Sequence, residues 1–215
     1  DDLIASYSSK GPTPIDHVVK PDLLAPGNII VSTLDKTSVL YGAYQGNEVL
    51  KSSYNTNTAT STLSNSYYKL SGTSMATPVV SGAVAILLQR EPGLTPDQVK
   101  ARLMKTASKS FPAQSSVTDP VTGITYLSTY DLFTVGAGYL DIAAALNSTD
   151  IAPSQYSALS PVAFGAPADG NVLIADSSAV WGASAVWGAS AVWGASRGWG
   201  SGAAWGGGAV WGGRV

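Results

Sequence analysis

Apolar residues gather in one long run near the middle of the chain, from Val79 to Leu88, directly after a cluster of small polar residues. The run is long enough for a buried helix of about four turns that begins close to Ser74. Ser74 would then lie on the first turn, where unpaired backbone N–H groups and the positive end of the helix dipole face outward. The pattern therefore predicts a serine at the N-terminus of a buried helix.

A second helix is expected to begin after Thr95. Thr95 is suited to be the N-cap, Pro96 stands at the first helical position, and Gln98 completes a capping box. Apolar residues of this helix are expected to face the core and charged residues to face water. The apolar set is Val99, Leu103 and Met104, and the charged set is Lys100, Arg102 and Lys105.

The remaining regular structure is predicted to be short. Residues 3–8 indicate a strand, and residues 28–34 are apolar on both faces, which is typical of a strand buried in a parallel sheet. Residues 41–50 predict a hairpin around positions 45–47. Residues 108–130 are expected to be irregular, and Asp141 is expected to cap a helix over residues 142–146.

The C-terminal part has a different character. Residues 151–170 are expected to form a linker, and residues 171–215 carry all six tryptophans at intervals of six, at positions 181, 187, 193, 199, 205 and 211. On a helix this period would scatter the rings, whereas on a strand every ring would lie on one face. The repeat favours an extended conformation, and its Gly and Ser content leaves open whether the tail is ordered.

Composition narrows the class of protein. The chain has 215 residues, which allows one substantial core plus an appendage, and it has no cysteine for disulfides or thiolate metal sites. A net charge of −2 with 12% charged residues does not favour nucleic-acid binding. No apolar stretch is long enough for a membrane span. The N-terminal Asp1-Asp2 lacks the features of a signal peptide, so the chain is expected to be an internal or processed piece of something longer.

Two interpretations of Ser74 are open from the residues alone. A Ser or Thr before an apolar helix is most often only an N-cap. However, a serine on the first turn could also expose its Oγ as a nucleophile and use its own N–H to hold an oxyanion. The surrounding run from Gly72 to Pro78 is made of small residues, which would let a substrate backbone approach closely.

The motif Gly72-Thr73-Ser74-Met75-Ala76-Thr77-Pro78 resembles the nucleophile motif of the subtilisin-like serine peptidases, or subtilases. A second block resembles this family in the right order, Ser8 to Thr13 followed by Lys20-Pro21-Asp22-Leu23-Leu24-Ala25-Pro26-Gly27. The resemblance implies an α/β fold in which residues 1–150 are the C-terminal part of a subtilisin-like parallel-sheet domain flanked by helices. It also implies that Ser74 is the nucleophile, supported at the cleft by Ser71, Gly72, Thr73 and Met75.

The resemblance does not extend to the other members of a catalytic triad. The family's Asp and His motifs are absent, and the one histidine, His17, is expected to be a solvent-facing loop residue. Asp22 resembles a structural aspartate that holds its turn. No asparagine has the context of the family's oxyanion residue; those considered are Asn28, Asn47, Asn55, Asn57 and Asn65.

These observations predict a serine endopeptidase that is active only with a complementary N-terminal portion, which supplies the Asp, the His and the oxyanion Asn. Its substrate would be a protein or peptide, and its location extracellular or in the cell envelope. No cofactor is required for the chemistry, and although structural calcium is common in the family, no acidic cluster here has convincing ligand spacing. The alternative is an inactive, self-assembling protein that uses a subtilase scaffold and the tail of residues 171–215. The polar segment 35–69 is either a surface loop or an insertion that shapes access to the site.

Overall fold

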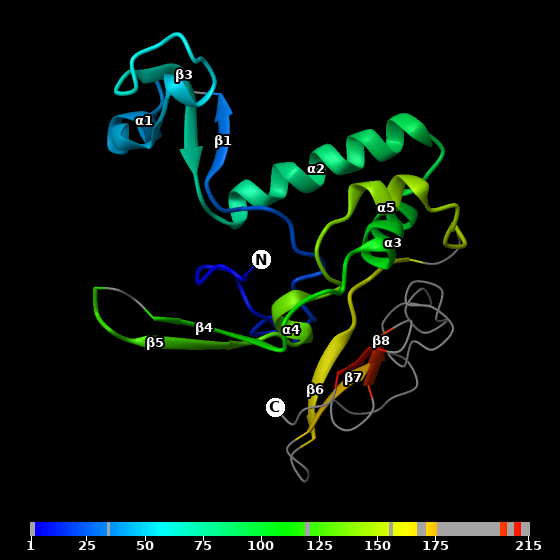
Figure 1. Cartoon of the computed structure of the whole chain (residues 1–215). Coiled ribbons are helices and arrows are strands. Elements are labelled where there is room, and N and C mark those ends of the chain that lie inside the picture. The colour runs from blue at the N-terminus through cyan, green and yellow to red at the C-terminus, as the bar shows by residue number, and fades with distance from the viewer. Residues whose placement is uncertain are drawn as a thin grey trace. The chain divides into compact units, whose positions relative to one another are not determined.

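The structure is a computed structural model that describes residues 3–33, 35–118, 121–154, 157–166, 171–175, 203–205 and 209–211. The chain divides into two compact units, Pro26–Val79 on one hand and Asp1–Ala25 with Val80–Val215 on the other. Figure 1 labels most of their helices and strands. Both strands and helices occur along the chain, so the structure is of the mixed α/β kind.

The smaller unit, Pro26–Val79, is built on a three-stranded sheet in the order β1-β3-β2. All pairs in this sheet are antiparallel, with Ile30 opposite Leu70 and Glu48 opposite Tyr68. The elements of this unit are β1 (Ile30–Thr33), α1 (Val39–Ala43), the 3₁₀ helices Gln45–Asn47 and Lys51–Ser53, β2 (Glu48–Leu50) and β3 (Leu63–Leu70).

Two predictions for this unit are wrong. The strand expected to be buried in a parallel sheet is instead an antiparallel edge strand, and its Val31 is 52% exposed. The hairpin expected around positions 45–47 is replaced by α1 and a 3₁₀ turn, because β2 pairs with β3 and not with the residues before it. The hydroxyl of Tyr68 on β3 donates to the carbonyls of Leu40 and Tyr44, 3.2 and 2.9 Å away, and so holds the end of α1 on the sheet.

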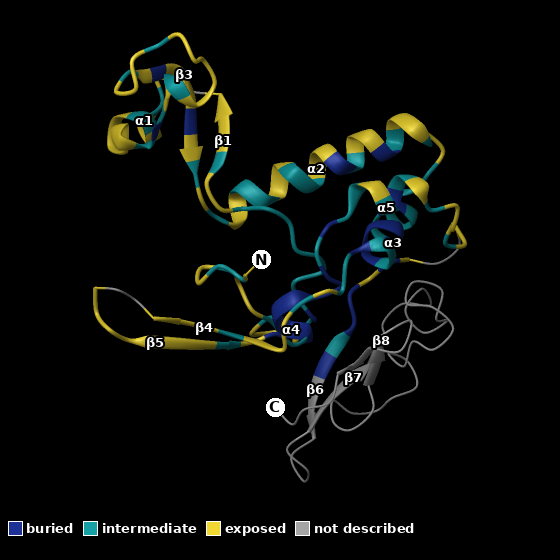
Figure 2. Ribbon diagram, in the orientation of Figure 1, coloured by how far each residue is buried: buried dark blue, intermediate teal, exposed yellow. Residues whose placement is uncertain are grey.

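The helix predicted after the serine is present as α2 (Thr73–Arg90), which is 18 residues long. Its burial differs from the prediction, because only Ala83 and Leu87 are buried among its residues. Ile86, for example, is 45% exposed, and Figure 2 shows exposed and half-buried positions along most of the helix. The described residues therefore leave much of the apolar surface of α2 uncovered.

The larger unit packs short helices against loops and hairpins. Its core contains Leu103, Met104, Tyr130, Phe133 and Val135, all of which are at most 6% exposed. Its further elements are α3 (Pro96–Thr106), β4 (Gln114–Thr118), β5 (Thr125–Thr129), α4 (Leu132–Val135), α5 (Ile142–Asn147), β6 (Val162–Ala166), β7 (Asn171–Ala175), β8 (Ala203–Trp205) and β9 (Ala209–Trp211). The pairs β4–β5, β6–β7 and β8–β9 are antiparallel.

The predicted start of α3 is confirmed. The Thr95 hydroxyl accepts from the Gln98 N–H, and the Gln98 side chain accepts from the Thr95 N–H, which is a complete capping box. The apolar residues of α3 are buried as expected, but Arg102 does not face water. It is 3% exposed and forms two hydrogen bonds to Glu91, at 2.5 and 3.0 Å. Arg102 can turn inward because the ion pair with Glu91 offsets part of the cost of burying its guanidinium.

Other short elements also differ from prediction. Residues 3–8 form turns and not a strand, with the Ile4 N–H bonded to the Tyr130 hydroxyl at 2.9 Å. Residues 108–130, expected to be irregular, contain the β4–β5 hairpin. The helix predicted after Asp141 is confirmed as α5, since the Asp141 side chain accepts from the Ala144 N–H.

The segment from Ala158 to Ala163, within the predicted linker, is held by two backbone–backbone hydrogen bonds and one to a side-chain carboxylate. The Val19 N–H donates to the Pro161 carbonyl, the Ala163 N–H donates to the His17 carbonyl, and the Ala158 N–H donates to Asp97. Most of the tryptophan repeat lies outside the described residues, so its order stays a prediction, as do the predicted domain bounds. In the described part of the chain, no helix is both long and apolar enough to span a bilayer.

Candidate active site

Ser74 lies on the first turn of α2, as the sequence predicts, and it is exposed. Within the described part of the chain, nothing forms a hydrogen bond with its hydroxyl. The oxygen is therefore neither buried in packing nor occupied as an N-cap. A serine hydroxyl in this position is available to a base and to a substrate carbonyl.

The backbone around Ser74 also provides donors. The N–H groups of Met75 and Ala76 both point back to the Gly72 carbonyl, at 3.0 and 3.3 Å. The N–H groups of Thr73 and Ser74 have no acceptor among the described residues. Free amides at a helix N-terminus lie at the positive end of its dipole and attract a developing negative charge. Pro78, inside the helix, has no N–H for the Ser74 carbonyl, which loosens this first turn.

Gly27 supports the loop that carries the nucleophile. Its carbonyl accepts from the Gly72 N–H at 2.8 Å. A Cβ on Gly27 would lie 2.8 Å from the Gly72 oxygen and 3.2 Å from the Ala76 Cβ, so no larger residue fits without displacing the loop. Sequence reasoning assigned no site role to Gly27. The available signal was its place at the end of the block from Lys20 to Gly27.

The residues predicted to support the site occupy different positions around it. The Ser71 hydroxyl accepts from the Ile29 N–H at 2.8 Å and donates to the Asn28 side chain at 2.9 Å, so it holds the loop before β1. The Thr73 carbonyl accepts from the Thr77 hydroxyl at 3.1 Å. The half-buried Met75 packs beside Gly72, since a Cβ on Gly72 would lie 3.6 Å from its Sδ.

No imidazole belongs to the unit that carries Ser74. The single histidine, His17, is exposed in a turn of the larger unit with a φ of 54°, as expected for a loop residue. In the part of the chain that the structure describes, no three His, Asp or Glu side chains come together as a metal site would require. Within the smaller unit, the structure thus brings together Ser71 to Met75 and Gly27, and this unit contains no histidine.

Asp22 holds a half-buried polar cluster in the larger unit. Its carboxylate accepts from Lys20 and from the Ser160 hydroxyl, and the Lys100 ammonium lies 3.1 Å away. Burial alone would raise the pKa of Asp22, but the hydrogen bonds from Lys20 and Ser160 and the charges of the lysines outweigh it, so the pKa lies below its ordinary 3.8. The structural role predicted for Asp22 is consistent with this arrangement.

The geometry has what a nucleophilic serine needs, namely an exposed hydroxyl and a free N–H at a helix N-terminus, in a loop of small residues. The particular family follows from comparison with known proteins. The model of the subtilase family matches residues 1–160, so the chain belongs to the subtilase family.

Three relatives illustrate the similarity. The serine protease AprX of Bacillus subtilis (strain 168) is 40% identical over 109 residues, which are 51% of this chain and 21% of that protein. The subtilisin-like protease SBT1.6 of Arabidopsis thaliana is 32% identical over 147 residues, 67% of this chain and 17% of that protein. SBT1.3 of the same plant is 32% identical over 158 residues, 72% of this chain and 18% of that protein. The chain thus spans roughly a fifth of the length of these relatives.

Proposed function

We propose that this chain is the nucleophile-bearing part of a subtilisin-like serine endopeptidase. Ser74 attacks the carbonyl carbon of a peptide bond, and its proton passes to a histidine. The resulting oxyanion is held by the free N–H of Ser74, and collapse of the tetrahedral intermediate expels the amine and leaves an acyl-enzyme that water hydrolyses. The observation that carries the proposal is the exposed Ser74, whose hydroxyl and N–H have no partner among the described residues.

The histidine, its orienting aspartate and an oxyanion asparagine would come from a complementary N-terminal portion of the catalytic domain. Two observations support this. The unit with Ser74 contains no histidine. In addition, α2 buries only Ala83 and Leu87, although it is apolar along most of its length. Covering such a surface with a second portion of protein would contribute about 25 cal/mol for every Å² of apolar area removed from water.

The remaining assignments follow from this role. The substrate is a protein or peptide, and the enzyme works outside the cell or in its envelope. The chemistry itself needs no cofactor, because the Ser74 hydroxyl is activated by a base and not by a metal ion. Ser71, Gly72, Thr73 and Met75 shape the loop that presents Ser74 to the substrate.

A fluorophosphonate probe tests the proposal on the chain assembled with its N-terminal portion. The probe should form an adduct on Ser74, and Ser74→Ala should abolish both the adduct and peptide hydrolysis. Ser81→Ala, which removes a hydroxyl from the same helix, should retain both. An assembled protein that hydrolyses nothing and carries no adduct on Ser74 would remove the enzymatic assignment. Mass spectrometry of the native protein would show whether a second polypeptide accompanies the chain.

Deletion of residues 171–215 tests the alternative of a self-assembling protein. Retained hydrolysis with loss of assembly is expected if the tail is an accessory to an enzyme. Filaments that form only with the tail, from a protein without any peptidase activity, would favour the structural role.

A further inference from the structure

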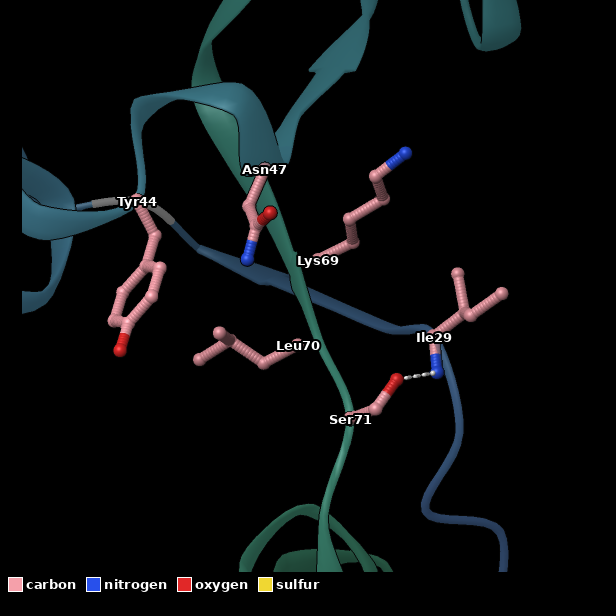
Figure 3. Close-up of a pocket in the computed structure, with 6 residues that line it drawn as sticks. All are labelled: Ile29, Tyr44, Asn47, Lys69, Leu70 and Ser71. Carbon is pink, nitrogen blue, oxygen red and sulfur yellow. Dashed lines mark hydrogen bonds between the residues drawn. The ribbon is translucent and has the colours of Figure 1, made fainter. Parts of the chain in front are cut away.

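A pocket lies in the smaller unit beside the strand that leads to Ser74. Its volume is about 470 Å³, and it is lined by Ile29, Tyr44, Asn47, Lys69, Leu70 and Ser71. Tyr44 and Asn47 come from the polar segment 35–69, and the last three residues come from β3 and its C-terminal continuation. Figure 3 shows these side chains around the end of β3, with the hydrogen bond between Ser71 and Ile29.

The pocket is within reach of a substrate bound at Ser74. Ser71 is three positions before Ser74, so their Cα atoms are at most about 11 Å apart. An extended peptide advances about 3.3 Å per residue. The distance from Ser74 to the edge of the pocket at Ser71 thus corresponds to at most about three residues of an extended substrate.

The two sides of the strand differ in chemistry. Because side chains alternate along a strand, Lys69 and Ser71 lie on one side and Leu70 on the other, next to Tyr44 (Figure 3). Lys69 is the only charged residue of the lining, and it forms no ion pair within the described ranges. By contrast, Lys36 of the same unit lies 3.6 Å from the Glu48 carboxylate. Lys69 thus provides a cation that the described part of the chain does not neutralise.

The neighbouring groups suit a short acidic side chain. Ile29 is 62% exposed and offers an apolar surface for methylene groups. The Ser71 hydroxyl is already bonded to Ile29 and Asn28, so it does not compete for the Lys69 ammonium. Lys69 itself is exposed, so its flexible stem can turn to meet a carboxylate.

From this arrangement we infer that the pocket is a specificity subsite, in which Lys69 selects a Glu or Asp side chain about three residues from the cleaved bond. The inference rests on the proposed peptidase function and assigns a role to the segment 35–69, which contributes Tyr44, Asn47 and Lys69 itself to the lining. A solvent-exposed ion pair is weak, so the selection is moderate: about threefold to fivefold over a neutral isostere, and smaller at high salt.

Paired peptide substrates test the subsite on the assembled peptidase. Each pair differs only by Glu against Gln at one position within three residues of the cleaved bond. The wild type should cleave the Glu peptide about three to five times faster, in kcat/KM, at one position. Lys69→Met should bring this ratio to about one, and Lys69→Glu should reverse it. Lys51→Glu, the same charge change in the same segment but outside the pocket, should leave the ratio unchanged.

The outcomes separate the two proposals. Equal cleavage of Glu and Gln peptides at every position by an active wild type would overturn the subsite alone. The subsite would also be overturned if Lys69→Glu and Lys51→Glu showed the same ratio of kcat/KM for the Glu peptide over the Gln peptide. No hydrolysis of any peptide, together with no fluorophosphonate adduct on Ser74, would instead overturn the peptidase function.

Discussion

At the scale of single residues, the site depends on close backbone contact as much as on the nucleophile. Ser74 is presented by a loop whose Gly72 N–H is bonded to the Gly27 carbonyl at 2.8 Å. Gly27 has no room for a side chain, since a Cβ would come within 2.8 Å of the Gly72 oxygen. A residue 47 positions before Ser74 in the sequence therefore sets the position of its hydroxyl.

Gly27→Ala should displace the Gly72–Ser74 loop and lower kcat/KM by about 10- to 100-fold, because small misplacements of a nucleophile are costly. The rate of fluorophosphonate labelling should fall in parallel, while the substrate KM changes little. Gly42→Ala is the matched control, since a Cβ at Gly42 meets nothing within 4 Å. Wild-type labelling rates in Gly27→Ala would contradict a positioning role for this glycine.

At the scale of elements, the local sequence of α3 predicts where the helix begins but does not predict all of the side chains that are buried. Its capping box is encoded within four residues and forms as predicted. Arg102, on the same helix, is expected from the sequence to face water, yet its side chain is 1% exposed because Glu91, outside the helix, binds it. Hydrogen bonds from Arg102 hold the pKa of Glu91 below its ordinary value.

Glu91→Gln should lower the free energy of unfolding, because it leaves the buried Arg102 guanidinium without a counter-charge. Urea unfolding of the full chain measures the change. Adding Arg102→Met should restore part of the loss, since the buried charge is then gone. The control is Lys105→Met, whose partner Asp150 is 63% exposed, and about 0–1 kcal/mol is expected there. If Glu91→Gln and Lys105→Met lowered the free energy of unfolding equally, the buried Arg102–Glu91 pair would contribute no more to stability than the exposed Lys105–Asp150 pair.

At the scale of the whole molecule, the larger unit is closed by contacts between distant parts of the chain. Asp22 and Lys20 from the N-terminal segment, Lys100 from α3 and Ser160 from the C-terminal side form one cluster. The backbone adds further ties, since the Leu24 N–H donates to the Gly138 carbonyl and the Leu140 N–H donates to the Leu24 carbonyl, both at 2.8 Å. The isolated bridge between Leu24 and Tyr139 is the one parallel pairing among the described strands and bridges.

Asp22→Asn should lower the free energy of unfolding at neutral pH by about 2 kcal/mol, through the loss of charge-assisted hydrogen bonds. The folded-state pKa of Asp22 is lowered, so its stabilisation is complete well above 3.8 and is lost as the pH falls through the lower folded-state pKa. The difference between wild type and variant should therefore shrink towards about pH 3. Urea unfolding midpoints of the wild type and Asp22→Asn, measured at neutral pH and at about pH 3, check this.

The exposed Asp16, replaced by Asn, provides the control and should change the midpoint less. A wild-type advantage over Asp22→Asn that stays constant down to acid pH would contradict the assignment of the cluster to the ionised carboxylate.

The sequence by itself determined the features that depend on a few neighbouring residues. The start of α2 at the serine, the capping box of α3 and the Asp141 cap of α5 each need only side chains within about one helical turn. The motif around Ser74 likewise identified both the candidate nucleophile and the family. For such features, the energetically decisive partners are adjacent in the chain.

The tertiary structure decided the features whose partners are far away. Pairing of β1 with β3 joins residues about 40 positions apart, and it converts an expected buried parallel strand into an exposed antiparallel one. The burial of Arg102 and the contact of Gly27 with Gly72 arise in the same way. A short run of apolar, β-branched residues indicates that a segment is extended. It does not show which strand the segment pairs with, because that choice depends on packing and hydrogen bonds across the whole unit.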